Sequence, residues 1–302
     1  MMARLLEALK PDCRLILVGD PQQLTSVGAG AVLGDLVRGY AQRPSPPVVE
    51  LSRNFRSEED IKALAAALQV GDPDVVLDVL RSSSSGQVSF VEAASEDELV
   101  EELRPDLVRA ALDIRRRAEA EDPEGALGAL DQQRLLCAHR EGPYGVRRWN
   151  GLVERWLAEE VGEVGGPAVA GWYIGRPLLV TNNDYALDVY NGETGVVVRQ
   201  GQRRRVYISG SGRLRDFAPG RLDAVETMHA MTIHKAQGSQ ARKVTVLLPE
   251  EGSRLLTREL FYTAITRAQR EVRVVGTEAA VRAAVTRRAQ RASGLAERLA
   301  GG

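Results

Sequence analysis

The chain has 302 residues, of which 44% are hydrophobic and 27% charged, and its net charge is −1. This length predicts two domains, or one domain with an insertion, and the charge excludes a surface coated with positive side chains. No apolar run approaches the ~20 residues of a membrane span. The cysteines, Cys13 and Cys137, are too few and too distant for a disulfide framework or a zinc site. We therefore expect a cytoplasmic protein with no membrane partner.

Helices and strands are predicted to alternate along the first 160 residues. Helices are expected at 2–10, 28–39, 57–70, 95–120 and 144–161, and strands at 14–18, 48–51, 87–93 and 135–139. The run RLILV at 14–18 is continuous and apolar, which is typical of a buried strand in a parallel sheet. The rigid segment RPSPP at 43–47 indicates a domain boundary.

The pattern changes after the glycine-rich stretch 162–171. Short strands follow, with Asn-Gly, Gly-Gln and Ser-Gly turns between them: PLLVTNN, YNGETGVVV, RRVYIS and RLRDF. This rhythm indicates a small barrel of roughly 45 residues. From residue 225 the α/β pattern returns, with strands predicted at 243–249 and 271–276, a helix at 257–269 and a closing helix. A barrel is thus expected to interrupt a doubly wound domain.

The stretch GDPQQL at 19–24 follows the first predicted strand. Ligands of open α/β sheets bind at the carboxyl ends of the strands. A glutamine carboxamide both donates and accepts hydrogen bonds, so it can orient a water or contact a terminal phosphate. A capped turn, in which Asp20 accepts from backbone amides, explains the same residues equally well.

Two arginine-bearing stretches follow the same logic. LSRNFRSEED (51–60) puts Arg53 and Arg56 at a strand end, and FYTAITRAQRE (261–271) puts Arg267 and Arg270 late on a helix. A rigidly held arginine at such a place can stabilise charge on a transferring phosphoryl group. The alternative is an arginine that donates to the last carbonyls of the helix.

The stretch AMTIHKAQGSQ (230–240) gathers several polar groups in one loop after a strand. Small hydroxyls, an imidazole and open backbone amides suit contact with a nucleic-acid backbone. A lone histidine is more often structural, but His234 has polar neighbours, namely Thr232, Lys235, Gln237 and Gly238.

Taken in order, these four stretches resemble the third to sixth signature motifs of superfamily-one DNA helicases. The closest likeness is to the RecD family, the alpha subunits of exodeoxyribonuclease V. Three further stretches carry that likeness, which covers essentially the whole chain: VGAGAVLGDLV, VTNNDYALDVYNGETGVV and RRAQRASGLAERL.

The resemblance implies an α/β fold with a RecA-like (P-loop NTPase-type) parallel sheet domain. That second motor domain would comprise 46–176 and 223–302, with an SH3-like β-barrel insertion at 177–222. The C-terminal remnant of a first RecA-like motor domain would occupy 1–45.

The resemblance also implies a function, ATP-dependent 5′–3′ DNA translocation in double-strand-break repair and recombination. Single-stranded DNA and RecB- and RecC-like subunits would be the partners. The nucleotide would be contacted by Gln23, which senses the γ-phosphate, by Arg56 and Arg267, and by Gln237 and Gly238. Single-stranded DNA would be contacted by Thr232, His234 and Asn182.

The chain departs from the family at the nucleotide site. None of its four lysines follows a glycine or precedes Ser or Thr, so the loop that cradles phosphates is absent, as is the Asp-Glu strand end that would hold Mg²⁺. ATP and Mg²⁺ are expected only with a missing N-terminal half, and the chain is expected to be inactive alone. Two alternatives stay open: a non-catalytic single-stranded-DNA-binding or complex-assembly module, and the motor half of a conjugative relaxase-helicase.

Overall fold

The computed structural model describes residues 2–24, 32–41, 46–49, 58–162, 171–210, 212–289, 295 and 299. The helices in these residues are α1 (Met2–Glu7), α2 (Val32–Tyr40), α3 (Glu59–Val70), α4 (Pro73–Ser82), α5 (Glu96–Glu119), α6 (Pro123–Leu130), α7 (Val146–Val161), α9 (Arg258–Ile265) and α10 (Glu278–Thr286), with a 3-10 turn η1 (Pro219–Arg221). None of the helices in this part of the chain is long and apolar enough to span a membrane.

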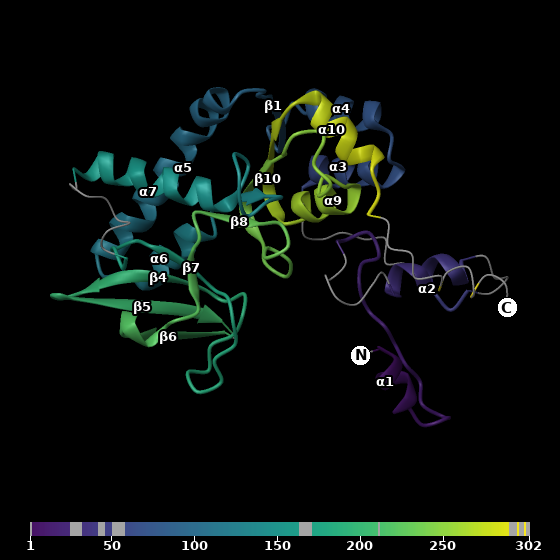
Figure 1. The fold of residues 1–302 in the computed structure, drawn as a ribbon, viewed down its shortest axis with the longest axis horizontal. Helices are drawn as coiled ribbons and strands as arrows, with labels where there is room; N and C mark the ends of the chain where they lie inside the picture. Colours follow the sequence, from purple (N-terminus) through teal and green to yellow (C-terminus); the bar gives the residue numbers. More distant parts are fainter. Residues whose placement is uncertain are drawn as a thin grey trace.

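A parallel sheet forms the centre of the larger body (Figure 1). Its strands lie in the order β1-β10-β9-β2-β8, and every neighbouring pair is parallel. Their bounds are β1 (Val88–Glu92), β2 (Gln133–Cys137), β8 (Ala230–Thr232), β9 (Ala241–Leu247) and β10 (Ala268–Gly276). The central strands are apolar on both faces because parallel sheets are covered by helices on both sides.

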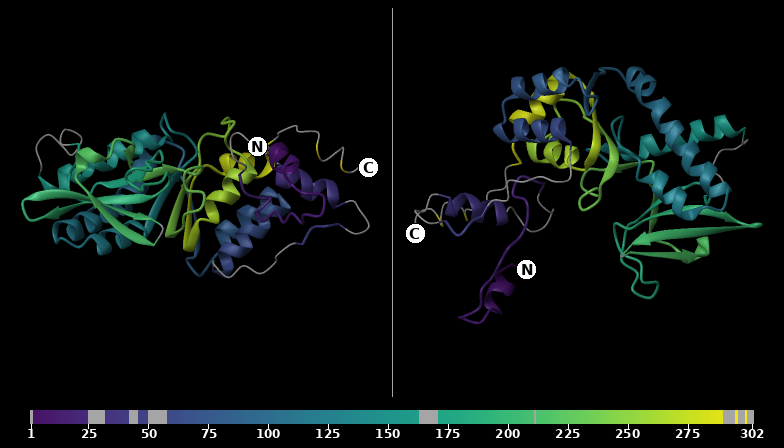
Figure 2. Two further views of the ribbon diagram at one scale, coloured as in Figure 1. Left: turned by 90° about the horizontal axis from the view of Figure 1, so that it is seen from below. Right: turned by 180° about the vertical axis from the view of Figure 1, so that it is seen from behind.

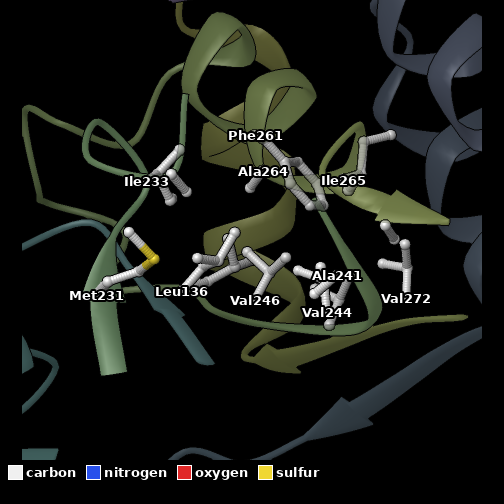
Figure 3. Packing of buried hydrophobic residues seen from close by; sticks show 14 of the residues in the cluster. Leu136, Met231, Ile233, Ala241, Val244, Val246, Phe261, Ala264, Ile265 and Val272 are labelled. Carbon is white, nitrogen blue, oxygen red and sulfur yellow. The ribbon is translucent and has the colours of Figure 1, made fainter. Parts of the chain in front are cut away.

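Side chains that alternate along the strands divide between two cores. Leu136 packs in the core formed with α3, α4, α9 and α10, whereas Leu135 and Cys137 pack in the core formed with α5 and α7. Figure 3 shows the first core, in which Val244 and Val246 of β9 face Phe261 of α9. The result is a three-layer α/β arrangement, so the α/β fold with a parallel sheet is confirmed.

A second sheet, antiparallel throughout, lies beside the first in all three ribbon views (Figures 1 and 2). Its order is β6-β5-β4-β3-β7, with bounds β3 (Pro177–Val180), β4 (Thr194–Gln200), β5 (Arg203–Gly210), β6 (Arg213–Phe217) and β7 (Val225–Thr227). Both faces of β4 are buried: Val197 packs with Val206 and Ile208 of β5, and Val196 and Val198 belong to the larger core. The predicted strands of this region are confirmed, whereas the barrel stays a prediction.

A network of hydrogen bonds joins the two sheets where the chain passes between them. Tyr173 Oη donates to Glu154 Oε1 (3.3 Å), and Thr227 Oγ1 donates to the same oxygen (3.2 Å). Arg176 Nε donates to Thr227 Oγ1 (2.9 Å). The Nε2 atom of His229 lies 2.8 Å from Tyr173 Oη, a hydrogen bond whose donor depends on the tautomer of the imidazole. Burial lowers the pKa of His229 to about 3, so its imidazole is neutral near pH 7.

Gly175 brings the entry to this antiparallel sheet close against α5. Its φ is +85°, and a Cβ there would lie 2.6 Å from Arg115 Cα. Gly175→Ala should lower the free energy of unfolding by about 1–3 kcal/mol or more, because backbone must shift to admit the methyl group. The matched control is Gly192→Ala, which has the same left-handed strain (φ +94°) but meets nothing within 4 Å. Urea denaturation of both variants measures the difference, and equal losses would contradict the close approach.

Several predicted elements near the N-terminus differ in the structure. Residues 14–18 form no strand, and Ile16 and Val18 are 73% and 89% exposed. A strand exists only through hydrogen bonds to a neighbour, and no described segment pairs with this one. Residues 48 and 49 likewise have no regular structure, while 50 and 51 lie outside the described residues. Two short helices, α4 and α6, were not predicted.

Candidate functional site

The GDPQQL stretch folds as a turn organised by Asp20. One carboxylate oxygen of Asp20 accepts from the Gln22 backbone N–H (2.9 Å) and the other from Gln23 Nε2 (3.0 Å). The capped turn that the sequence allowed is therefore present. It also fixes the Gln23 carboxamide, whose nitrogen is directed to Asp20 in this conformation.

This turn lies against α9, 239 residues further along the chain. The Leu24 N–H donates to Thr263 Oγ1 (2.7 Å), and the Leu24 carbonyl accepts from Gln237 Nε2 (2.6 Å). Tyr262 also has the Asp20 carboxylate as a partner: burial raises the Tyr262 pKa, and the charge of Asp20 raises it further. The structure thus brings together three of the four predicted motifs, those that carry Gln23, Gln237 and Arg267.

Arg267 lies at this junction but is turned inward. Helix α9 ends at Ile265, and Arg267 follows the C-cap residue Thr266. The Arg267 residue is only 8% exposed, and its guanidinium is engaged by protein groups. It donates from Nε to the Thr263 carbonyl (3.0 Å), from Nη2 to Thr266 Oγ1 (3.1 Å) and from Nη1 to the Ser239 carbonyl (3.5 Å). The geometry is that of an arginine satisfying the last carbonyls of a helix.

Of the other three predicted arginines, the structure describes Arg270 but not Arg53 or Arg56. The expected helix over 257–269 is too long, because Ala268 already pairs with Ala241 as the first residue of β10. Arg270 therefore lies in a strand, where it pairs with Glu58 at the surface. Arg53 and Arg56 lie outside the described residues.

The loop after β8 has the composition expected of a nucleic-acid contact. Thr232 ends the strand, and its Oγ1 accepts from the Lys235 backbone N–H (3.2 Å). His234 is half-buried, whereas Gln237 and Gly238 are exposed at the tip. Because this loop leaves the carboxyl end of a parallel strand, it lies where ligands of open α/β sheets bind.

The loop between β3 and β4 reaches this same surface. Lys235 Nζ donates to Asn191 Oδ1 (3.2 Å), which joins the β8 loop to the antiparallel sheet. Asn182 is exposed in the same β3–β4 loop. The structure therefore brings the segment that carries Asn182 to the segment that carries Thr232 and His234.

Two residues of the junction were not singled out from the sequence. Thr263 is completely buried and holds Leu24, and Tyr262 contacts the Asp20 turn. Both lie inside the stretch FYTAITRAQRE, which drew attention through its arginines. Helical spacing put Thr263 on the same side as Arg267, one turn earlier and away from the apolar face, and nothing in the sequence indicated its burial or its contact with Leu24.

The described residues do not by themselves fit ATP with Mg²⁺. They include no group of three or more His, Cys, Asp or Glu side chains that could hold a metal ion. The only lysines of the chain lie outside any phosphate-cradling motif. What the junction offers is a carboxamide, Gln23, and a guanidinium, Arg267, both held by protein groups. These fit one side of a polyphosphate site and not the cradle or the metal.

Comparison with known proteins shows the family to which this sequence belongs. The family model for a UvrD-like helicase C-terminal domain matches residues 227–275, and that for an AAA domain matches residues 1–93. The RecBCD enzyme subunit RecD of Mycolicibacterium smegmatis is 56% identical over 299 residues, which is 99% of this chain and 51% of that protein. The chain is a RecD-family sequence. It spans about half the length of that relative.

More distant relatives extend the RecD likeness. The RecBCD enzyme subunit RecD of Haemophilus influenzae is 30% identical, again over 99% of this chain and 52% of that protein. Among solved structures, the Pif1 helicase from Bacteroides in complex with ADP-AlF3 and ssDNA aligns with 86% of this chain and 62% of that chain. Its sequence identity is 17% and its TM-score is 0.41. At these values the likeness says nothing about the site of the RecD-family chain, which is described from its own residues.

Proposed function

We propose that this RecD-family chain supplies the second motor domain, and an edge of the first, of an ATP-dependent DNA translocase that moves 5′ to 3′. Residues 46–176 and 223–302 form the second RecA-like domain, residues 177–222 an SH3-like insertion, and residues 1–45 the end of the first domain. The phosphate-cradling loop and the Mg²⁺-binding acids come from another segment or polypeptide.

The contact between the Asp20 turn and α9 carries this proposal. Leu24 is held by Thr263 on one side and by Gln237 on the other, so segments far apart in sequence close on one junction. A junction of two parts, with a carboxamide from one and an arginine from the other, is the arrangement that nucleotide-driven motors require. The proposed nucleotide contacts are Gln23, Gln237, Gly238 and Arg267. Arg56, which lies outside the described residues, is the fifth.

The guanidinium of Arg267 faces inward, so it has to change its hydrogen-bond partners when a nucleotide binds. Three of its hydrogen bonds go to two carbonyls and one hydroxyl, which are neutral acceptors. Hydrogen bonds to charged groups are about twice as strong as those between neutral groups. A triphosphate at the junction therefore draws the guanidinium from its carbonyls, and the same arginine caps α9 when the site is empty.

Single-stranded DNA is the proposed substrate of the adjoining surface. Thr232 and His234 lie at the carboxyl end of β8, and Asn182 lies in the loop that Lys235 holds against them. RecB- and RecC-like subunits are the proposed partners, and repair of double-strand breaks in the cytoplasm is the proposed role. The relatives' names, RecBCD enzyme subunit RecD, support these proposed partners and this proposed role.

A titration with single-stranded DNA tests the assigned surface. Thr232→Ala combined with His234→Ala should weaken binding at least about tenfold, because a hydrogen bond to a charged group contributes about 1.5–3 kcal/mol. The slope of log affinity against log salt should fall by roughly 0.7 for each phosphate that the variant no longer binds. Thr286→Ala, on α10, removes a hydroxyl that bonds its own helix and serves as the control. Unchanged affinity in the double variant would contradict the proposal.

A further inference from the structure

The loop between β3 and β4 carries an aromatic side chain that the core does not use. Tyr185 is 78% exposed, the most exposed aromatic residue in the described part of the chain. Among the described aromatic residues, Tyr190 meets this ring edge-on, with the ring centroids 6.2 Å apart and the planes at 77°. Most of the ring area is therefore open to a ligand.

A chain of hydrogen bonds fixes the position of Tyr185 relative to the β8 loop. Asn183 Nδ2 donates to Tyr185 Oη (3.3 Å), and Asn183 Oδ1 accepts from the Asn191 N–H (2.8 Å). Asn191 Oδ1 in turn accepts from Lys235 Nζ (3.2 Å). Three contacts thus link the exposed ring to the ammonium group beside Thr232 and His234.

The backbone of the loop is ordered before any ligand arrives. Asp184 and Val189 exchange both backbone hydrogen bonds, N–H to carbonyl, at 2.7 and 2.9 Å. Asp184 Oδ1 accepts from the N–H groups of Ala186 and Leu187, which closes the turn beneath the ring. A tyrosine has only two side-chain torsions to fix, so stacking on this ring costs little conformational entropy.

The loop carries three carboxylates, Asp184, Asp188 and Glu193, of which Asp188 and Glu193 pair with Arg215. The carboxylate of Asp184 is engaged by two backbone amides. Asp188 accepts from the Tyr190 hydroxyl (2.8 Å) and lies 3.8 Å from Arg215 Nη1. The cation nearest to the ring along the hydrogen-bonded path is Lys235. An accessible aromatic ring joined to a cation is the combination with which proteins bind single strands, since the base stacks and the phosphate pairs.

We propose that Tyr185 is a stacking platform for one unpaired base of single-stranded DNA, next to the backbone contacts of the β8 loop. This proposal rests on the proposed function, because it takes the β8 loop as the DNA track. It adds a contact to the base, where Thr232, His234 and Lys235 contact only the backbone. A base inside a duplex is stacked on its neighbours and is not accessible to the ring, so the contact also favours single strands over duplexes.

The test compares the full chain and its variants by fluorescence anisotropy with two labelled oligonucleotides of equal length. One is oligo-dT, and the other has abasic sites throughout and keeps only the sugar-phosphate backbone. Tyr185→Ala should weaken binding of oligo-dT by roughly 5- to 100-fold, as expected for the loss of one stacked base. The same variant should bind the abasic strand with the affinity of the wild type. Tyr185→Phe keeps the ring and should bind both strands like the wild type. The salt slope should be the same in all three proteins, since each of them binds the same phosphates.

Leu214→Ala is the matched control, because Leu214 is an apolar side chain, 40% exposed, on β6 of the same sheet. Tyr185→Ala that binds oligo-dT as tightly as the wild type overturns the platform, and so does an equal loss on both oligonucleotides. If Thr232→Ala with His234→Ala weakens binding while Tyr185→Ala does not, the platform fails and the proposed DNA surface stands. If the wild-type chain binds no single-stranded DNA, both fail.

Discussion

In a motor completed with a phosphate-cradling loop, Arg267→Lys should lower ATP turnover by on the order of 10³-fold or more. A guanidinium that stabilises charge on the transferring phosphoryl group contributes this much, and an ammonium group does not reproduce its planar set of donors. The measurement is steady-state ATP hydrolysis with single-stranded DNA present, after the chain is joined to or mixed with the polypeptide that carries the loop.

The competing explanation for Arg267 is a purely structural role as a cap of α9. Its guanidinium is bonded to the carbonyls of Thr263 and Ser239, so the substitution also removes a cap of α9. Loss of those bonds should cost about 1–2 kcal/mol of unfolding free energy, which leaves most molecules folded and explains little of a 10³-fold effect. Arg270→Lys is the control, because Arg270 lies nearby and, among the described residues, pairs with Glu58 at the surface. Near-normal turnover in Arg267→Lys would mean that the arginine is structural alone.

The chain should lose stability as the pH falls below 6.5 because of His229. Burial, and to a lesser degree the charge of Arg176, lowers the pKa of this imidazole from 6.5 to about 3. The unfolded chain therefore binds a proton between these values that the folded chain does not, and stability decreases as the pH falls through this window. The expected loss between pH 8 and pH 5 is about 2 kcal/mol, and it approaches its limit only near pH 3.

Urea denaturation at a series of pH values checks this expectation. His229→Gln removes the titrating group and keeps a side-chain N–H that can donate to Tyr173, so its stability should fall less between pH 8 and pH 5. The difference between the two proteins isolates His229 from Glu154 and the other carboxylates around it. Parallel pH profiles would show that the imidazole is protonated without cost, contrary to the lowered pKa that its burial causes.

Periodicity predicted most of the α/β body because local pattern and final packing agree there. The run LLCAH is buried on both sides, and Leu135 and Leu136 divide between the two helical layers as a central parallel strand requires. The antiparallel strands were equally predictable from their turn residues. Helices α4 and α6 each begin with an N-cap aspartate followed by proline, Asp72-Pro73 and Asp122-Pro123, a helix-start signal that the helix predictions did not use.

The segment 14–18 shows the limit of predicting a strand from its own residues. RLILV has the composition of a buried strand, yet Ile16 and Val18 are exposed because hydrogen bonds to a neighbour, and not composition, create a strand. For the site, sequence order predicted that the motifs meet but not how. The inward bonds of Arg267 and the contact between Leu24 and Thr263 depend on tertiary packing that no local pattern encodes.

The central claim is that this chain completes a nucleotide site whose phosphate cradle comes from elsewhere. The most direct measurement is ATP hydrolysis by the 302-residue chain with single-stranded DNA, alone and after addition of the polypeptide that carries the Gly-Lys-Ser/Thr loop and the Asp-Glu strand. We expect no hydrolysis by the chain alone and DNA-stimulated hydrolysis by the pair. Hydrolysis by the chain alone that persists through rigorous purification, or a bound pair that stays inactive with DNA, would contradict the claim.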